Sequence, residues 1–223
     1  MKTLFHHKKD LIEICHVCYE NKFVSAMDGN LSIRISENEI LTTATKTVKG
    51  KITADDLVMV SLDGKKLKGQ KNPSSELEMH LTIYKQRNDV KAVVHCHPTY
   101  ATAFALARKP LDDCLIPEVI TVLGSIPVAD YATPGTDELP KSLIPHLQNS
   151  AAILMANHGA VTYGSDIFDA YYKMEKLEHF AHITFLSFQI GGPKPLTSQQ
   201  LVSLKNAIES KGDLFLGNCI PEK

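Results

Sequence analysis

The sequence predicts an α/β fold, a single layered domain over residues 1–223 with a central mixed or mainly antiparallel sheet flanked by helices. Strand-like and helix-like segments are interspersed along the chain, but strict β-α-β alternation is absent. The length of 223 residues suits one domain with a substantial core. Neither G-x-G-x-x-G nor G-x-x-x-x-G-K-[ST] occurs, so dinucleotide-binding and P-loop folds lack their sequence anchors.

The N-terminal half is predicted to be rich in strands. An amphipathic helix is expected at about 10–22, and Gly29 then marks a change of structure. Residues 31–36 alternate with period two and, after a turn, residues 40–43 form a second strand, as in a β-hairpin. A further strand at 57–60 is followed by Asp63-Gly64, a strong hairpin turn signal before residues 65–68.

The second half alternates irregularly between the two kinds of element. Ser75 and Glu78 match a capping box, which predicts that a helix starts at Ser74-Ser75. A strand is expected at 92–97, where an apolar run leads into two histidines. The remaining expected elements are a helix at 99–108, short strands near 118–123 and 126–129, a helix at 137–148, a strand at 151–156, a long helix from 165 to 190 and a last helix at 198–211.

Charge and hydropathy exclude several partners. The 24 basic and 25 acidic residues nearly cancel, which leaves no broad basic field for nucleic acid or an anionic membrane. No apolar run of about 18 residues and no signal-peptide pattern is present, so a cytoplasmic protein is expected.

The five cysteines are odd in number and scattered, which favours free thiols. Cys15 and Cys18 have the C-x-x-C spacing of a zinc knuckle, but no second C-x-x-C completes it. Together with Leu11 and Ile14 they instead have the spacing of a buried helical stripe, and we favour that interpretation.

Three histidines at strand ends carry the main functional signal. His95 and His97 lie two apart, so in an extended strand both imidazoles share a face and can converge on one metal ion. His158 follows another apolar run. A lone histidine at a strand end is usually a satisfied polar group, but three of them favour an open, catalytic type of metal site.

An anion pocket is predicted beside this site. Ser74 and Ser75 place hydroxyls next to the free N–H groups of a helix N-terminus, and Glu76 adds a carboxylate that the helix dipole alone could explain. Gly29-Asn30 and Thr43-Ala44-Thr45-Lys46 offer further donors. A metal that polarises a carbonyl, a carboxylate that moves a proton and an anion pocket together indicate carbon–carbon bond chemistry on a sugar phosphate.

In these residues the chain resembles the class II aldolase/adducin family, whose members include sugar-phosphate aldolases and 4-epimerases. The resemblance covers roughly residues 10–190. The matching motifs, in the family's order, are Gly29-Asn30-Leu31-Ser32, Thr43-Ala44-Thr45, Pro73-Ser74-Ser75-Glu76, His95-Cys96-His97, Tyr131-Ala132-Thr133-Pro134-Gly135-Thr136 and Asn157-His158-Gly159.

The resemblance implies a zinc-dependent aldolase that reversibly cleaves a ketose or deoxyketose 1-phosphate, such as L-fuculose 1-phosphate, to dihydroxyacetone phosphate and an aldehyde. It implies that His95, His97 and His158 bind the metal, and that Glu76 is a fourth ligand that swings away to act as acid/base. Mn²⁺ or Co²⁺ could replace Zn²⁺ at such ligands. It further implies a homotetramer with sites at subunit interfaces, and the following phosphate-binding set: Gly29, Asn30, Thr45, Ser74 and Ser75.

Two positions depart from the family pattern. Lys46 stands where the family's phosphate loop commonly has glycine, and it could add charge to the phosphate grip or point to solvent. Glu118 occupies the segment where fuculose-phosphate aldolases carry a tyrosine that protonates the aldehyde oxygen from a neighbouring subunit. Glu118 could take over that proton transfer or be structural.

Alternative functions remain open at this point. The same metal site could serve a sugar-phosphate 4-epimerase or a dehydratase, a metal-hydroxide hydrolase is less favoured, and a non-catalytic adducin-like interaction module is the rival from another class. Histidines without converging partners are expected to play no part in the site: His6, His7, His16, His80 and His146. His179 and His182, with Glu175 and Glu178, favour an ion-pair face on the long helix.

Overall fold

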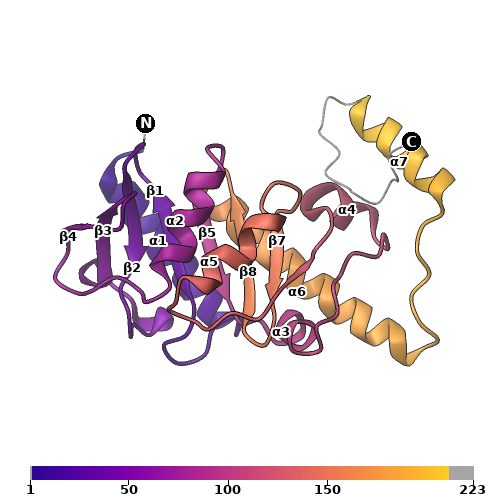
Figure 1. The fold of residues 1–223 in the computed structure, drawn as a ribbon, viewed down its shortest axis with the longest axis horizontal. Coiled ribbons are helices and arrows are strands. Elements are labelled where there is room, and N and C mark those ends of the chain that lie inside the picture. The colour runs from indigo at the N-terminus through magenta and orange to yellow at the C-terminus, as the bar shows by residue number, and fades with distance from the viewer. Residues whose placement is uncertain (1, 211–223) are drawn as a thin grey trace.

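The computed structural model describes residues 2–210, and its centre is one eight-stranded sheet in the order β4-β3-β2-β1-β5-β8-β7-β6 (Figure 1). Only the pairing of β6 with β7 is parallel, and the other neighbours pair antiparallel. The predicted mixed, mainly antiparallel sheet is therefore confirmed.

The strands are β1 (Asn30–Arg34), β2 (Glu39–Thr43), β3 (Leu57–Ser61), β4 (Lys66–Lys68), β5 (Ala92–Cys96), β6 (Val128–Ala129), β7 (Ala152–Met155) and β8 (Gly159–Gly164). The α-helices are α1 (Leu4–Glu20), α2 (Leu77–Gln86), α3 (Thr99–Leu106), α4 (Pro117–Leu123), α5 (Glu138–Leu143), α6 (Ile167–Gln189) and α7 (Ser198–Glu209). Three short 3₁₀ helices are η1 (Lys49–Lys51), η2 (Ala54–Asp56) and η3 (Ile144–His146).

Helices cover both faces of the sheet, with two separate apolar cores between them. Apolar side chains of α1, α3, α4 and α6 pack on one face, and those of α2 and α5 pack on the other. The central strand β5 serves both cores, because Val94 points to the first and Val93 to the second. By the same alternation His95 faces the side of α2, and this placement decides which residues it meets.

The segment 118–123 is helical, not a strand as its β-branched residues suggested. Pro117 occupies the first turn of α4, where its fixed φ favours a helix, and Gly124 ends the helix with a φ of +66°. Val119, Ile120 and Leu123 are buried, a spacing that fits one helical face. Tertiary packing overrides β propensity here.

Other boundaries also differ from the predictions. The first helix begins at Leu4, six residues before the expected start. The helix expected from Ser74-Ser75 begins at Leu77, with Glu76 at its N-cap and no side-chain capping bond, so the predicted capping box does not form. The expected helix 137–148 is divided between α5 and η3, and β8 was not foreseen. Residue 211, the expected end of the last helix, lies outside the described residues.

Cys15 and Cys18 lie in the buried stripe of α1, as the core interpretation predicted. With Cys96 they are free thiols, whereas Cys114 is disulfide-bonded, so the expectation of free cysteines is wrong at that position. Cys219 lies outside the described residues. Glu178 does not form the expected ion pair. Its carboxylate instead accepts hydrogen bonds from the backbone N–H groups of Tyr100 and Ala101 at the start of α3.

Among residues 2–210, no helix combines the length and apolar character needed to cross a bilayer.

Candidate functional site

Two neighbouring strands bring the three predicted histidines together. His95 lies near the end of β5, paired with Val161 of β8, and His97 follows that strand. His158 lies in the tight turn between β7 and β8, next to Asn157, whose φ is +57°. The ring centroids are 4.8 to 5.1 Å apart, and one nitrogen from each ring lies within 4.8 Å of the others, so the three could hold a metal ion.

The backbone fixes how His95 is oriented. Its Nδ1 lies 2.9 Å from the carbonyl oxygen of Ala160. A carbonyl can only accept, so Nδ1 carries the proton and Nε2 presents a lone pair to the cluster. Nε2 of His95 lies 3.1 Å from Nε2 of His97. Two ring nitrogens this close need a proton or a cation between them.

Glu76 completes the cluster from the N-cap of α2. Its Oε2 lies 3.3 Å from Nε2 of His95, and its Oε1 lies 3.1 Å from Nε2 of His158. Burial alone would raise the pKa of Glu76, but the adjacent imidazoles of His95 and His158 together lower it well below the usual range. The carboxylate is therefore ionised.

The donor set fits a divalent cation. Oε1 of Glu76 and Nδ1 of His158 are buried side-chain atoms without a hydrogen-bond partner of good geometry. Three imidazoles and a carboxylate are the ligands that Zn²⁺ accepts at catalytic centres, and a bound cation would satisfy the orphaned carboxylate oxygen.

His97 is held neutral and packed against a glycine. Burial, followed by the proximity of His95 and His158, lowers the pKa of His97 to about 3. A Cβ at Gly159 would lie 2.4 Å from Cδ2 of His97 and 2.7 Å from the carbonyl oxygen of Cys96. Only glycine at this position lets β8 begin directly against the ring.

The loops of the predicted phosphate set are joined to one another. The N–H of Thr45 donates to the carbonyl of Asn72 at 3.0 Å, and Ala44 forms a bridge with Pro73, so the Thr45 loop lies beside Ser74. The hydroxyl of Ser74 accepts from the N–H of Glu76 at 3.2 Å. Ser74 and Ser75 therefore lie directly before Glu76, and the Thr45 loop is hydrogen-bonded to the segment that precedes them; Thr45 and Ser74 are half-buried and Ser75 is exposed.

Gly29 lies against the histidine strand. It has a φ of +71°, and a Cβ there would lie 2.8 Å from the carbonyl oxygen of His95. Lys46 is exposed and has a φ of +56°. This left-handed conformation disfavours a Cβ, so glycine would be less strained than lysine at the position of Lys46.

Asn30 has a role that sequence reasoning missed. Its side-chain amide donates to Oε2 of Glu76 at 2.8 Å, so it contacts the carboxylate directly. Behind it, Nε2 of His80 lies 2.5 Å from Oδ1 of Asn30. The expectation that His80 has no converging partner is wrong. No sequence signal revealed it, because its partners lie on β1, some fifty positions away.

Lys49 is a second residue that the sequence did not single out. It is 1 % exposed, and its ammonium donates to the backbone carbonyls of Met27, Asp28 and Thr47 at 2.8 to 3.3 Å. Burial lowers its pKa. Lys49 therefore ties the loop before Gly29 to the loop after Lys46.

Glu118 is not brought to the cluster within this chain. It lies exposed in the first turn of α4, and among residues 2–210 no hydrogen bond or ion pair joins its side chain to the histidines.

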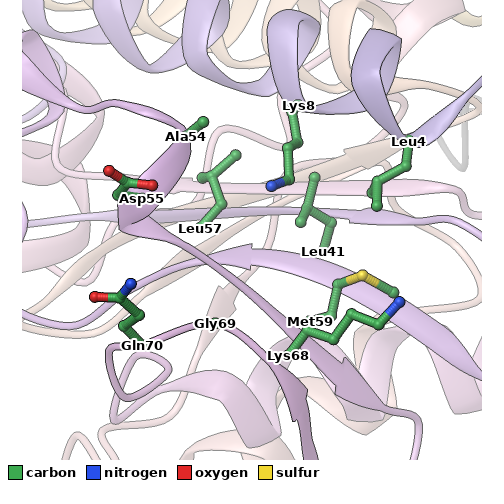
Figure 2. Close-up of a pocket in the computed structure, with 10 residues that line it drawn as sticks. All are labelled: Leu4, Lys8, Leu41, Ala54, Asp55, Leu57, Met59, Lys68, Gly69 and Gln70. Atoms are coloured by element: carbon green, nitrogen blue, oxygen red, sulfur yellow. The ribbon is translucent and has the colours of Figure 1, made fainter.

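A cavity of about 220 Å³ lies elsewhere, between α1 and the strands β2 to β4 (Figure 2). Leu4, Leu41 and Met59 line its apolar part, and Lys8 and Lys68 reach it from opposite sides. None of its lining residues belongs to the histidine cluster, so it is separate from the candidate site.

The comparisons with known proteins agree with this geometry. Residues 9–185 match the family model described as the class II aldolase and adducin N-terminal domain. The chain is 39 % identical over 177 residues to the L-fuculose phosphate aldolase of Methanococcus maripaludis, covering 79 % of this chain and 95 % of that protein. It is 32 % identical over 203 residues to the 3-oxo-tetronate 4-phosphate decarboxylase of Haemophilus influenzae, covering 89 % and 96 %.

A solved L-fuculose 1-phosphate aldolase superposes with a TM-score of 0.84 at 30 % identity, over 94 % of this chain and 98 % of that one. The family match spans the sheet, the histidines and Glu76. The chain therefore belongs to the class II aldolase and adducin family.

Proposed function

We propose that the protein is a zinc-dependent aldolase that reversibly cleaves a ketose or deoxyketose 1-phosphate, such as L-fuculose 1-phosphate, to dihydroxyacetone phosphate and an aldehyde. The observation that carries this proposal is the half-buried, ionised Glu76, whose carboxylate oxygens lie 3.3 Å from Nε2 of His95 and 3.1 Å from Nε2 of His158, two of the three converging histidines. Relatives named as L-fuculose phosphate aldolases support the choice of substrate class.

In this proposal His95, His97 and His158 hold the metal and Glu76 is its fourth ligand. A divalent ion supplies Lewis acidity, which polarises the substrate carbonyl. Glu76, released from the cluster when substrate binds, takes the proton from C3 of dihydroxyacetone phosphate in the direction of synthesis and returns it after cleavage. The carboxylate is ionised while it faces the histidines, so it is free to accept a proton once it leaves them.

The phosphate is proposed to bind at the joined loops of Gly29, Thr45, Ser74 and Ser75. Their hydroxyls and backbone N–H groups are uncharged donors. Exposed Lys46 adds a cation at the rim. Asn30 stays a member of the proposed set, although its amide N–H is engaged by Glu76 in this structure.

Decarboxylation of a keto-acid phosphate is a second candidate, favoured by the similarity to 3-oxo-tetronate 4-phosphate decarboxylases. Both reactions break a carbon–carbon bond near a carbonyl and leave the electron pair beside it, so one site could serve either. A 4-epimerase or a dehydratase would use the same residues. The complete set of three histidines and Glu76 argues against a non-catalytic adducin-like module.

Glu118 is proposed to protonate the aldehyde oxygen from a neighbouring subunit, because it lies apart from the cluster of its own chain. That role requires an oligomer, and we propose a homotetramer. Large apolar side chains near the end of α6, including Phe188 and Ile190, are at least half exposed and offer surface for such an interface. Light scattering on the purified protein tests the tetramer.

Product analysis tests the reaction. The zinc-loaded protein is incubated with a panel of ketose 1-phosphates and 3-oxo-tetronate 4-phosphate, with Glu76→Gln as the blank. Release of dihydroxyacetone phosphate that disappears in the variant supports the aldolase. Carbon dioxide from the keto acid alone supports the decarboxylase, and loss of substrate without cleavage moves the assignment to an epimerase or dehydratase.

A further inference from the structure

A chain of buried hydrogen bonds runs from the candidate site into the layer between the sheet and α2. It begins at Oε2 of Glu76, passes through Asn30 and His80, and continues through Ser32 to Tyr84. The last four are at most 4 % exposed. Four hydrogen bonds of 2.5 to 2.8 Å connect the five side chains.

The amide of Asn30 fixes the direction of this chain. Its Nδ2 donates to Oε2 of Glu76 at 2.8 Å, so its Oδ1 faces His80. Because Oδ1 only accepts, Nε2 of His80 must carry the proton.

The remaining two bonds follow from the neutral state of His80. Its burial, followed by the proximity of His95, lowers the pKa of His80 to about 3. A neutral ring with the proton on Nε2 has an acceptor at Nδ1, so the hydroxyl of Ser32 donates there. Ser32 then accepts from the phenol of Tyr84, whose pKa burial raises, so that it keeps its proton.

We propose that His80 is a positioning residue, which acts through Asn30 to hold the carboxylate of Glu76 at the histidine cluster. Without a donor at Nε2 of His80, the Asn30 amide has no preferred orientation and can turn its oxygen toward Glu76. Two oxygens would then face each other and the carboxylate would be displaced. The consequence for catalysis rests on the proposed acid/base role of Glu76.

Two matched variants separate positioning from mere packing. In His80→Gln the side-chain amide can place an N–H near the position of Nε2 and still donate to Asn30. In His80→Asn the shorter amide reaches only the position of Nδ1, so Ser32 keeps a partner but Asn30 loses its donor. Both replacements are polar and smaller than histidine, so loss of packing should lower their melting temperatures to a similar degree.

The expected result is a difference between the two variants in kcat and in metal affinity. Groups that orient metal ligands typically contribute roughly 10- to 100-fold. In His80→Asn we expect kcat to fall by about this factor with KM little changed, and apparent zinc affinity of the metal-free protein to fall about tenfold or more. His80→Gln should keep most of both. A rise in KM with kcat unchanged would show that Asn30 acts through phosphate binding. Equal falls in kcat and zinc affinity in both variants would show that His80 contributes only packing. Either result overturns the proposal.

A measurement on the unmodified protein needs neither activity nor a variant that folds. Long-range ¹H–¹⁵N NMR correlations report which nitrogen of a neutral imidazole carries the proton. We expect His80 of the metal-free protein to be the Nε2–H tautomer between pH 6 and 8, and finding the Nδ1–H tautomer or a charged ring overturns the proposal. If no substrate is turned over, the proposed function fails, while the tautomer and the zinc affinities still decide the role of His80.

Discussion

Gly159→Ala is the substitution by which the geometry of the histidine cluster is most sharply tested. The φ of Gly159 lies outside the left-handed region, so alanine adds only a methyl group to the start of β8. That methyl carbon would lie 2.4 Å from Cδ2 of His97 and 2.7 Å from the backbone oxygen of Cys96, whereas ordinary contact begins at 3.4 Å. The backbone cannot yield easily, so the imidazole must move.

The required movement is large for a metal ligand. To restore ordinary contact the ring has to shift by about 1 Å, several times the roughly 0.2 Å tolerance of a metal–ligand distance. We expect zinc affinity to fall about tenfold or more, which corresponds to about 1.4 kcal/mol or more of binding free energy. Overpacking should also lower the free energy of unfolding by roughly 1–3 kcal/mol.

Gly164→Ala is the matched control at the other end of β8. Its methyl carbon would lie 2.4 Å from Oδ2 of Asp169 and 2.8 Å from the N of Ala170, a similar clash away from the histidines. Competition with a chromophoric chelator measures zinc affinity, and urea unfolding measures stability. The reasoning is refuted if Gly159→Ala binds zinc as tightly as Gly164→Ala and the unmodified protein.

Four further outcomes are expected. Removing the metal with a chelator should lower the melting temperature, and restoring zinc at 100 times its Kd should add about 2.7 kcal/mol to the free energy of unfolding. If neither treatment changes stability, the histidine cluster does not bind the ion. Lys49→Met should cost roughly 1–3 kcal/mol in urea unfolding, because three backbone carbonyls lose the ammonium that joins them, whereas exposed Lys51→Met should cost little. Lys46→Gly should raise the free energy of unfolding by roughly 0.5–1 kcal/mol, since glycine tolerates the φ of +56°, and a loss of stability would show that this conformation is not strained. The pKa of His80 is lowered from 6.5 to about 3, so below pH 6.5 the unfolded chain binds a proton that the folded chain excludes. His80 should therefore not change the free energy of unfolding of the metal-free protein above pH 6.5, and should lower it by up to about 1.4 kcal/mol per pH unit below pH 6.5. In His80→Gln the fall in the free energy of unfolding on the acid side should be less steep by that amount.

The sequence was informative where one residue type repeats in one setting. The histidines at the ends of apolar runs predicted the cluster, because strand periodicity alone places His95 and His97 on a shared face. The mixed sheet followed from hairpin signals and from the absence of regular β-α-β alternation. These inferences need only local pattern, and the structure confirms the fold and the convergence of the three histidines.

Features that depend on packing between distant segments could not be predicted in this way. His80 looked like one more helical histidine until β1 was placed beside α2, which brings Asn30 and Ser32 to its two nitrogens. The helix α4 has β-branched residues, and only its burial against the core and its proline start favour a helix. Glu78 suggested a capping box, yet the chain keeps Glu76 at the N-cap, where its carboxylate faces the histidines.

The most direct test of the central claim is exchange of the C3 proton of dihydroxyacetone phosphate with solvent deuterium, followed by NMR without an aldehyde present. If Glu76 removes this proton, the zinc-loaded protein should exchange one C3 hydrogen stereospecifically, and Glu76→Gln should not. Equal exchange in both proteins would contradict the role of Glu76. Absence of exchange in the unmodified protein while a ketose 1-phosphate is still cleaved would contradict the proposed proton transfer.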